Sequence, residues 1–464
     1  MSQDGTSAGA FLEAAVVPRD TWHTSGTLNE AEAILAAHPG VAKHEIFTAA
    51  ALGDDVAVAH FLAGDASLAT ARGGPRGWDP LTYLCFSRYL RLDPARSGGF
   101  VRAAEALLDA GADPNTGWHE TRHQPEPCWE SVLYGAAGIA HHEALTRLLL
   151  ARGADPNDGE TPYHAAESYD MGVLRALVES GKLSDDGLTT LLLRKTDTHH
   201  GAGVAYLLEH GADPNRLSFW RKTALHNALI SDNAIEVIQS LLDHGADPNL
   251  PGDSGHGRRG AVRTGTSIAA RRGRRDVLEA LEGRGMPVVL EGVDRLVAAC
   301  ARDDSAAIRA IADAEPGLVA ALVAEGGELL AEFAGNGNTR GVGHLLDLGV
   351  GIAAPYALGD SYFGVAPGST ALHVAAWRAR PETVKLFLAR GAPVDLRDGH
   401  GRTPLMLAVK ACVDSYWMNR RSPDSVASLL DAGASTEGVP FPCGYPEVDS
   451  LLARRTPPGR GHVP

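Results

Sequence analysis

The sequence predicts an all-α solenoid of stacked helix pairs joined by short β-hairpin fingers, and two recurring motifs carry this prediction. The first motif, "GADPN", occurs four times without change, beginning at Gly111, Gly153, Gly211 and Gly245. The second motif contains a threonine and precedes a helix pair, as in "KTALHNAL" from Lys222 and "GSTALHVAA" from Gly368. Because the two motifs recur in the same order, we expect one helix-pair unit to be repeated along most of the chain.

Each "GADPN" motif marks the end of a helix. It follows an amphipathic stretch that closes on paired bulky residues, such as Leu107-Leu108 and Leu241-Leu242. The glycine suits a left-handed helix cap, where a β-carbon is disfavoured. The proline then prevents the helix from continuing, and Asp and Asn favour a turn. Looser copies, "GAPVD" at Gly391 and "GAST" at Gly433, extend the pattern toward the C-terminus.

The threonine motif marks the beginning of a helix. In "ETPYHAAE" from Glu160 and "GRTPLMLA" from Gly401 the threonine can cap the helix start. The proline that follows sits at the first helical position, where it costs no hydrogen bond. The small alanines allow neighbouring helices to approach closely.

Together the two motifs resemble the ankyrin repeat, whose consensus runs G-x-T-P-L-H-x-A-A, a second helix with Leu-Leu, and then G-A-D-V-N. The spacing from Gly211 to Gly245 is 34 residues, close to the ankyrin period of about 33. The resemblance covers roughly residues 44–437 and implies an ankyrin-repeat α-solenoid of about ten to eleven repeats. The chain also resembles bacterial ankyrin repeat proteins in "ACVDSYWMNRRSPDS" and "WESVLYGAAG", and this likeness implies no activity.

The repeats suggest five segments. We expect residues 1–43 to form an N-terminal helical cap with one helix, in "TLNEAEAILAAH", and residues 44–250 to form a first repeat array. A Gly- and Arg-rich loop and joining repeat is expected over residues 251–290. A second array over 291–437 and a C-terminal cap and tail over 438–464 complete the prediction.

Composition narrows the class of protein. The formal net charge is -15, which disfavours binding to nucleic acid and to anionic membranes. No apolar run approaches the roughly 18 residues that a membrane span needs. The five cysteines form no CxxC pair, and "GNGN" at Gly335 lacks the Lys-Ser/Thr of a phosphate loop. We therefore expect a cytoplasmic monomer without a cofactor.

The stretch "GWHETRHQPEP" contains His-Glu-x-x-His, with His119 and His123 as candidate zinc ligands. Such a site needs both histidines on one face of a stable helix. A glycine before the motif and two prolines after it leave room for two turns at most, too few for an isolated helix in water. A zinc hydrolase is therefore the weakest of the functions considered, and a polar loop is the alternative.

A second candidate chemistry is acid-base catalysis on a small molecule. In ankyrin folds the residues after the first helix face a concave groove, and here they include His141, Glu167, Tyr169 and Asp170. A pair such as Glu167 with His141 is suited to general acid-base work. No nucleophile motif accompanies the four residues, so a polar, solvated groove is the competing interpretation.

The function that the sequence favours is recognition of a protein or peptide on the concave groove, which can also accept a small ligand. Tryptophan and arginine concentrate binding energy at interfaces, and the leucine-rich repeat core does not need them. The predicted contact residues are Trp78, Trp118, Trp129, Tyr134, His142, Arg194, Asp197, His200, Trp220, Trp377, Arg378, Tyr416, Trp417 and Arg420. A basic run from Arg258 to Arg275 is a further candidate contact for an acidic partner.

Overall fold

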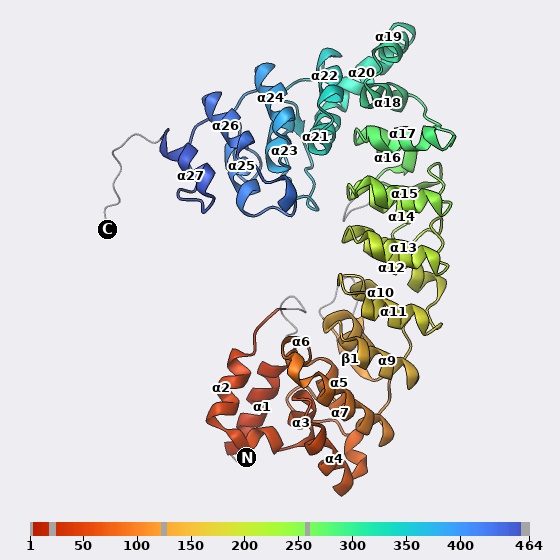
Figure 1. Cartoon of the computed structure of the whole chain (residues 1–464), viewed down its shortest axis with the longest axis vertical. Helices are drawn as coiled ribbons and strands as arrows, with labels where there is room; N and C mark the ends of the chain where they lie inside the picture. The colour runs from red at the N-terminus through yellow and green to blue at the C-terminus, as the bar shows by residue number, and fades with distance from the viewer. Residues whose placement is uncertain (1–2, 18–24, 122–127, 256–259, 456–464) are drawn as a thin grey trace. The chain divides into compact units, whose positions relative to one another are not determined.

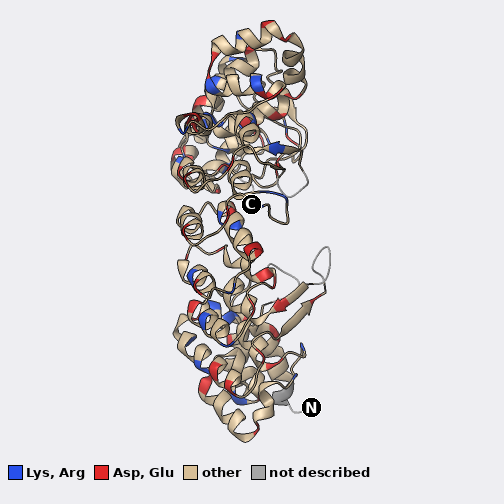
Figure 2. Ribbon diagram, turned by 90° about the vertical axis from the view of Figure 1, so that its right-hand side faces the viewer, with Lys and Arg blue, Asp and Glu red and all other residues tan. Residues whose placement is uncertain are grey.

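A computed structural model describes residues 3–17, 25–121, 128–255 and 260–455, in two compact units, Met1–Ser218 and Phe219–Pro464 (Figure 1). The five segments predicted above follow the sequence repeats, whereas the two units are defined by compactness. The segment boundaries therefore stay predictions. Helices dominate both units, as the all-α prediction requires. Acidic and basic residues are interspersed along the ribbon (Figure 2).

The first unit is built from short helices. Its helices are α1 (Gln3–Ala15), α2 (Asn29–Ala37), α3 (Ile46–Ala51), α4 (Asp55–Gly64), α5 (Pro80–Cys85), α6 (Arg88–Leu92), α7 (Ser97–Asp109), α8 (Val132–Tyr134), α9 (Glu143–Ala151), α10 (Glu160–Ala165), α11 (Met171–Glu179), α12 (Asp185–Asp197) and α13 (Gly201–Glu209). Single turns of other helix types are η1 (Pro39–Lys43), η2 (Ala66–Ala69), η3 (Pro94–Arg96) and η4 (Gly135–Ile139).

The second unit continues the same pattern. Its helices are α14 (Ala224–Ile230), α15 (Ile235–Asp243), α16 (Gly265–Arg271), α17 (Arg275–Gly283), α18 (Val293–Arg302), α19 (Ser305–Ala314), α20 (Pro316–Ala324), α21 (Gly326–Asn336), α22 (Thr339–Asp347), α23 (Ala371–Trp377), α24 (Pro381–Ala389), α25 (Pro404–Val413), α26 (Asp424–Asp431) and α27 (Pro446–Ala453). A single 3-10 turn, η5 (Met418–Arg420), follows α25.

Packing is layered within each unit, as expected of a solenoid. In the first unit α10 packs against α12, while α11 packs against α9 and α13. In the second unit α21, α23 and α25 form one layer, and α22, α24 and α26 form the other. Each repeat therefore buries its apolar face against its neighbours rather than in a single central core.

Among the described residues, three antiparallel hairpins form the fingers. The strand β1 (Gly117–Glu120) pairs with β2 (Cys128–Ser131), β3 (Pro251–Asp253) with β4 (Val262–Thr264), and β5 (Pro355–Tyr356) with β6 (Ser369–Thr370). The second hairpin lies in the Gly- and Arg-rich segment, and the third carries a long insertion.

Residues 1–43, predicted to form a cap with one helix, contain the two α-helices α1 and α2, so the prediction of one helix is wrong. In addition to α2, helix α1 packs against α2, η1 and α3, and it buries Phe11 and Leu12 completely. The sequence of α1 carries two glycines and few large apolar residues. Its helix formation depends on tertiary packing more than on intrinsic propensity, which explains why the pattern did not reveal it.

The repeat turns confirm the role given to the "GADPN" glycine. Gly111, Gly153, Gly211 and Gly245 all have positive φ, between 86° and 106°. A second position with positive φ lies in the turn between the two helices of a pair, and several of these positions hold a residue other than glycine. His141, His199 and Asp232 have φ of 49°, 54° and 52° at this position.

Within the part of the chain that the structure describes, helices are too short or too polar to cross a lipid bilayer.

Candidate partner-binding site

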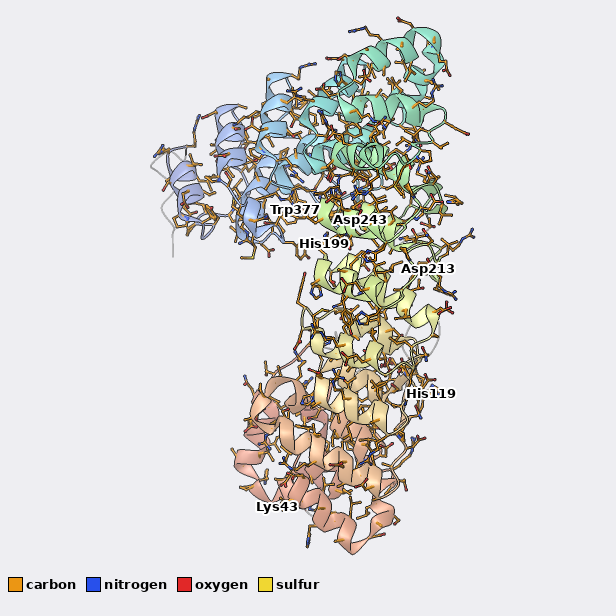
Figure 3. All side chains as sticks on the ribbon, turned by 45° about the vertical axis from the view of Figure 1, so that its right-hand side comes forward. Lys43, His119, His199, Asp213, Asp243 and Trp377 are labelled. Carbon is orange, nitrogen blue, oxygen red and sulfur yellow. The ribbon has the colours of Figure 1, made fainter. Side chains whose placement is uncertain are left out.

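The His-Glu-x-x-His stretch forms a strand rather than a helix where the structure describes it. His119 lies on β1 opposite Trp129 of β2, with 4.8 Å between the ring centroids (Figure 3). His123 lies outside the described residues. Because successive strand residues point to opposite faces, His119 and Glu120 face different ways. His119 therefore does not take the place on a helix face that the zinc motif requires.

Glu167 of the first unit pairs with His164 and Arg194 rather than with the predicted partner, His141. Its carboxylate contacts His164 Nδ1 and Arg194 Nη2, each at 3.1 Å. Arg194 also pairs with Asp197 and lies 4.0 Å from the ring centroid of Tyr163. Burial by itself would lower the pKa of His164, but hydrogen bonds to Glu160 and Glu167 raise it to about 9.

The acid-base pair of Glu167 with His141 is therefore wrong as a hydrogen-bonded pair. His141 lies in the left-handed turn before α9, and its Nδ1 atom is enclosed without a hydrogen-bond partner among the described residues. Burial lowers the pKa of His141. The backbone of Ala137 supplies a hydrogen bond to the ring and Glu167 is close enough to oppose the effect of burial, but the Glu167 carboxylate itself is bound by His164 and Arg194.

Two other predicted groove residues hydrogen-bond to the backbone. Asp170 accepts a hydrogen bond from Gly172 N at 2.9 Å and caps α11. His142 accepts from Leu145 N at 3.1 Å, caps α9, and contacts Ser97 Oγ through Nε2 at 2.7 Å. The helix caps explain the polar residues at these positions without a catalytic role.

Tyr169 is exposed, but it is not part of an acid-base cluster. Its hydroxyl donates to Thr198 O at 2.6 Å, and its ring lies 5.1 Å from that of His200. Nδ1 of His200 lies 3.1 Å from Nζ of the fully buried Lys195. Burial lowers the pKa of Lys195 to about 8.

Several aromatic residues predicted to contact a partner form the core of the first unit. Trp78 is 2% exposed, and its ring packs on those of Tyr83, Phe86 and Trp118. Tyr134 is also buried. The expectation that Trp78 and Tyr134 face a partner is therefore wrong. Trp118 and Trp129 are half-buried on the first hairpin.

The predicted residues of the second unit do come together, but in two layers. Trp377 at the end of α23 and Trp417 after α25 lie with their ring centroids 5.7 Å apart. Trp417 Nε1 donates to Trp377 O at 3.1 Å, and Trp377 Nε1 donates to Phe363 O at 2.6 Å. Both indoles are buried, so the prediction that they contact a partner directly is wrong, and they form the floor of the site. Trp220, near the start of the second unit, is 39% exposed.

Arg378 is buried beside this floor rather than exposed to a partner, which corrects its predicted role. Its guanidinium lies over the rings of Phe363 and Trp417 and contacts Asp232 at 2.5 Å. Asp232 also pairs with Arg272 at 2.7 Å. Burial by itself would raise the pKa of Asp232, but Arg272 and Arg378 hold it well below its ordinary value.

Above the tryptophan floor lies an accessible surface that we call the Arg-Tyr patch, formed by Arg380, Tyr416, Met418 and Arg420. Tyr416 is 85% exposed and Met418 is 71% exposed. The Arg420 guanidinium lies 5.4 Å from the Trp417 ring centroid, and Arg380 Nε donates to Gly335 O at 2.9 Å. The patch is thus apolar and cationic at once.

The two arginines of the patch have no salt bridge with any described residue. Burial and the nearby Arg420 and Arg378 lower the pKa of Arg380 to about 9. Burial and Arg378 lower the pKa of Arg420 to about 10, although Asp232 opposes this change. Two half-buried cations that repel each other favour an anion placed between them.

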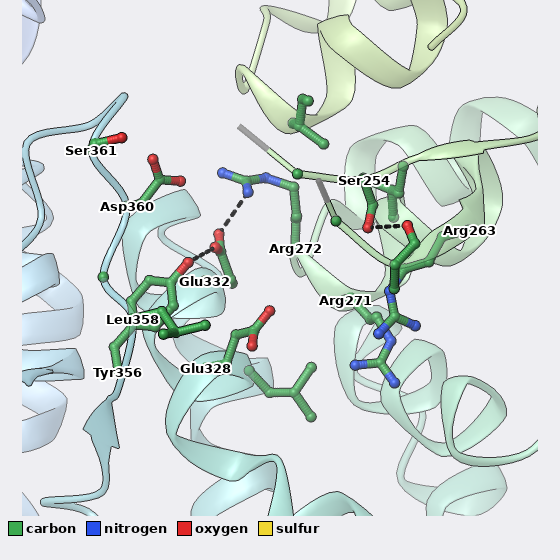
Figure 4. A pocket seen from close by; sticks show the side chains of 17 residues that line it. Ser254, Arg263, Arg271, Arg272, Glu328, Glu332, Tyr356, Leu358, Asp360 and Ser361 are labelled. Carbon is green, nitrogen blue, oxygen red and sulfur yellow. Dashed lines mark hydrogen bonds and ion pairs between the residues drawn. The ribbon is translucent and has the colours of Figure 1, made fainter. Parts of the chain in front are cut away.

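A cavity of about 480 Å³ opens elsewhere in the second unit (Figure 4). Its walls come from the β3–β4 hairpin, α16, α21 and the β5–β6 finger, and its charged lining includes Arg263, Arg271, Glu328 and Asp360. Sequence reasoning missed this cavity because its residues come from three distant segments and form no motif. The one available signal was the long insertion between β5 and β6.

Glu332 is the titratable group at the centre of that cavity wall. Arg272 contacts its carboxylate at 3.0 Å, and the Tyr356 hydroxyl donates to it at 3.0 Å. Burial raises the pKa of Glu332 to about 7 although Arg272 opposes this effect. Glu332 can thus hold or release a proton near neutral pH.

The basic run at the start of the second unit is neutralised internally where it is described. Arg271 pairs with Asp294 and Glu325, and Arg275 pairs with Glu279. Arg258 and Arg259 lie outside the described residues. The described part of the run is therefore a set of intramolecular ion pairs rather than a free cationic surface.

Two family models match the repeat pattern over parts of the chain. A family model described as ankyrin repeats in many copies matches residues 207–256, and one described as ankyrin repeats in three copies matches residues 330–437. The crystal structure of the human ASB11 ankyrin repeat domain is similar, with 21% identity, 59% of this chain and 98% of that chain covered, and a TM-score of 0.26. No curated protein sequence matches.

Proposed function

This chain is an ankyrin repeat protein, and from that premise we propose that it binds an acidic peptide segment of a protein partner at the Arg-Tyr patch. Ankyrin repeats are generally protein-interaction scaffolds. The observation that supports this site is the pair Arg380 and Arg420, two neighbouring guanidinium groups without a salt bridge among the described residues. The choice of an acidic segment follows from this unbalanced charge.

An anionic ligand supplies what the patch lacks. A carboxylate accepts charge-assisted hydrogen bonds from a guanidinium in a bidentate geometry, which gives both strength and orientation. It also removes the repulsion between Arg380 and Arg420. Arginine and tyrosine are residue types that concentrate binding energy at interfaces, and the patch combines both.

The layer below the patch keeps its side chains in place before a partner arrives. The hydrogen bond from Trp417 Nε1 to Trp377 O ties the segment after α25 to the end of α23. Arg420 lies over the Trp417 ring. A surface ordered in advance loses less conformational entropy on binding. The buried tryptophans therefore support recognition without touching the ligand.

The test compares peptides and variants. Fluorescein-labelled peptides of equal length, rich in Asp/Glu, neutral or rich in Lys, are titrated with the protein and followed by anisotropy. We expect the acidic peptide alone to bind, and Arg420→Ala and Tyr416→Ala each to weaken binding about tenfold, the effect of losing a contact of about 1.4 kcal/mol.

The matched control is Arg340→Ala, because Arg340 is an exposed arginine of the same unit on α22. This variant should bind the acidic peptide as the wild type does. Equal binding of all three peptides, absence of binding to the acidic peptide, or equal losses in the Arg340 and Arg420 variants would each reject the proposed site.

A further inference from the structure

We propose that Cys128, Glu130 and Glu160 of the first unit bind a divalent transition metal ion of the zinc type. The three side chains meet where the first hairpin packs against the start of α10. Their ligand atoms, one thiol sulfur and two carboxylate oxygens, all lie within 4.8 Å of one another. This site is separate from the Arg-Tyr patch and does not depend on the proposed function.

The local structure explains why these residues meet. Cys128 and Glu130 are two residues apart on β2, so the alternation of a strand points both to the same face. Glu160 is the first residue of α10. The Cys128 thiol donates to Glu160 Oε1 at 3.3 Å, so hairpin and helix already share a contact.

The burial of the Glu130 carboxylate supports a cation at this site. Its side chain is buried, with the residue 6% exposed, and it has no hydrogen bond or ion pair with any described residue. A buried carboxylate without a partner is costly, and native proteins normally pair such groups or use them to coordinate metals.

The surroundings of Glu130 are strongly anionic. Burial and then the neighbouring Glu160 raise the pKa of Glu130 to about 8; Glu120 and Asp158 act in the same direction, and His164 opposes them. Glu160 also raises the pKa of the Cys128 thiol, after burial. The two carboxylates and the thiol gather within 4.8 Å, so a divalent cation would neutralise negative charge that His164, among the described residues, only partly offsets.

His164 completes the arrangement from outside. Its Nε2 atom lies 3.2 Å from Glu160 Oε2, while Glu160 Oε1 faces the Cys128 sulfur. One carboxylate oxygen is thus held by the imidazole and the other is directed to the site. This is the outer-shell role in which a hydrogen-bonding partner orients a metal ligand.

The donor set selects the kind of metal. A thiolate with carboxylates suits zinc and related ions, whereas Mg²⁺ and Ca²⁺ prefer oxygen ligands alone. Tetrahedral zinc places its ligand atoms about 3.5 Å apart, so a separation of 4.8 Å closes by about 1 Å on binding. Cys128 and a protonated carboxyl release their protons to solvent as the metal-sulfur and metal-oxygen bonds form.

The experiment uses the chain of residues 1–464, stripped of metal with a chelator and then titrated with Co²⁺ or Zn²⁺. We expect one Co²⁺ per chain, with a thiolate-to-cobalt charge-transfer band in the near ultraviolet that Zn²⁺ removes. Cys128→Ser should abolish the band. Glu130→Gln, which keeps the side-chain size, should weaken Co²⁺ binding at least tenfold.

Two controls make the result specific. Cys443→Ser removes another half-buried thiol, and His119→Ala removes a histidine from the opposite face of the same hairpin. Both should bind Co²⁺ as the wild type does. If Cys128→Ser does not fold, judged by circular dichroism, the Glu130→Gln result decides alone.

Three results would overturn the metal site. They are the absence of stoichiometric Co²⁺ binding, unchanged binding in Glu130→Gln, or loss of binding in His119→Ala. The last result would instead indicate the His-Glu-x-x-His stretch as the metal ligand set.

Discussion

Asp232 is where the second unit concentrates its buried charge. This residue lies in the left-handed turn after α14, and it forms ion pairs with Arg272 and Arg378. Asn336 Nδ2 adds a hydrogen bond at 3.0 Å. Arg272 also pairs with Glu332 in the cavity wall, and Arg378 packs against the Trp417 ring below the Arg-Tyr patch. The Asp232 carboxylate therefore connects the cavity wall to the floor of the patch.

Replacing this carboxylate is predicted to destabilise the second unit. Asp232→Asn keeps the shape but leaves two buried guanidinium groups without their shared anion, and breaking a buried pair costs about 3–5 kcal/mol. The measurement is urea unfolding followed by circular dichroism. Asp414→Asn is the control, because its partner Lys410 and its own carboxylate are exposed and such pairs contribute about 1 kcal/mol or less.

The same variant should change the response to acid. Because the folded-state pKa of Asp232 is lowered, its contribution to stability is present above the ordinary value of 3.8 and is lost as the pH falls. The wild type should therefore lose more unfolding free energy than Asp232→Asn between neutral pH and pH values of about 3. Parallel pH profiles for the two proteins would contradict the role given to Asp232.

At the scale of elements, the repeat turns followed from the sequence and the partners of side chains did not. The "GADPN" turns could be predicted because glycine, proline and Asp or Asn act locally, through backbone φ and a missing donor. The burial of Trp377 could not, because it depends on Trp417, 40 residues along the chain, and on Phe363 in the insertion between β5 and β6, which carries no repeat motif. The same applies to Glu332, whose partners come from two other segments.

The backbone argument for the turn glycines gives a prediction with opposite signs at two sites. Gly245 has φ of 86° and Gly343 lies inside α22, and a β-carbon at either position would meet nothing within 4 Å. Space is therefore not the difference between them. Gly245→Ala should destabilise the protein by about 1–2 kcal/mol through backbone strain alone.

Gly343→Ala should stabilise the protein by about 0.5–1 kcal/mol, because alanine loses less conformational freedom in a helix than glycine does. Thermal unfolding of the two variants beside the wild type measures both effects. Shifts of the same sign would show that something other than backbone conformation decides the choice of glycine.

At the scale of the whole chain, many charged side chains form ion pairs, and others, among them Arg88, Arg91, Arg380 and Arg420, form none with a described residue. The net charge is -15, and acidic and basic residues are mixed along the ribbon (Figure 2). The arginines of the basic run from Arg258 to Arg275 form intramolecular ion pairs where they are described, such as Arg271 with Asp294 and Arg274 with Asp276. Arg380 and Arg420 differ from that run because each lacks a salt bridge among the described residues and they lie near each other beside the exposed Tyr416 and Met418.

This distribution predicts that the protein discriminates between a short acidic peptide and a polyanion. Duplex DNA binds through many phosphate contacts made at once, and each contact needs an available cation. A patch with two such arginines on an acidic chain offers too few, and the remaining negative charge repels the phosphates. Anisotropy titration of a labelled duplex should therefore show no binding even at about 50 mM salt, where such contacts are strong. Duplex binding that weakens steeply with added salt would mean that arginines in intramolecular ion pairs can exchange their partners for phosphates. The proposal that an acidic peptide is the preferred ligand would then be wrong.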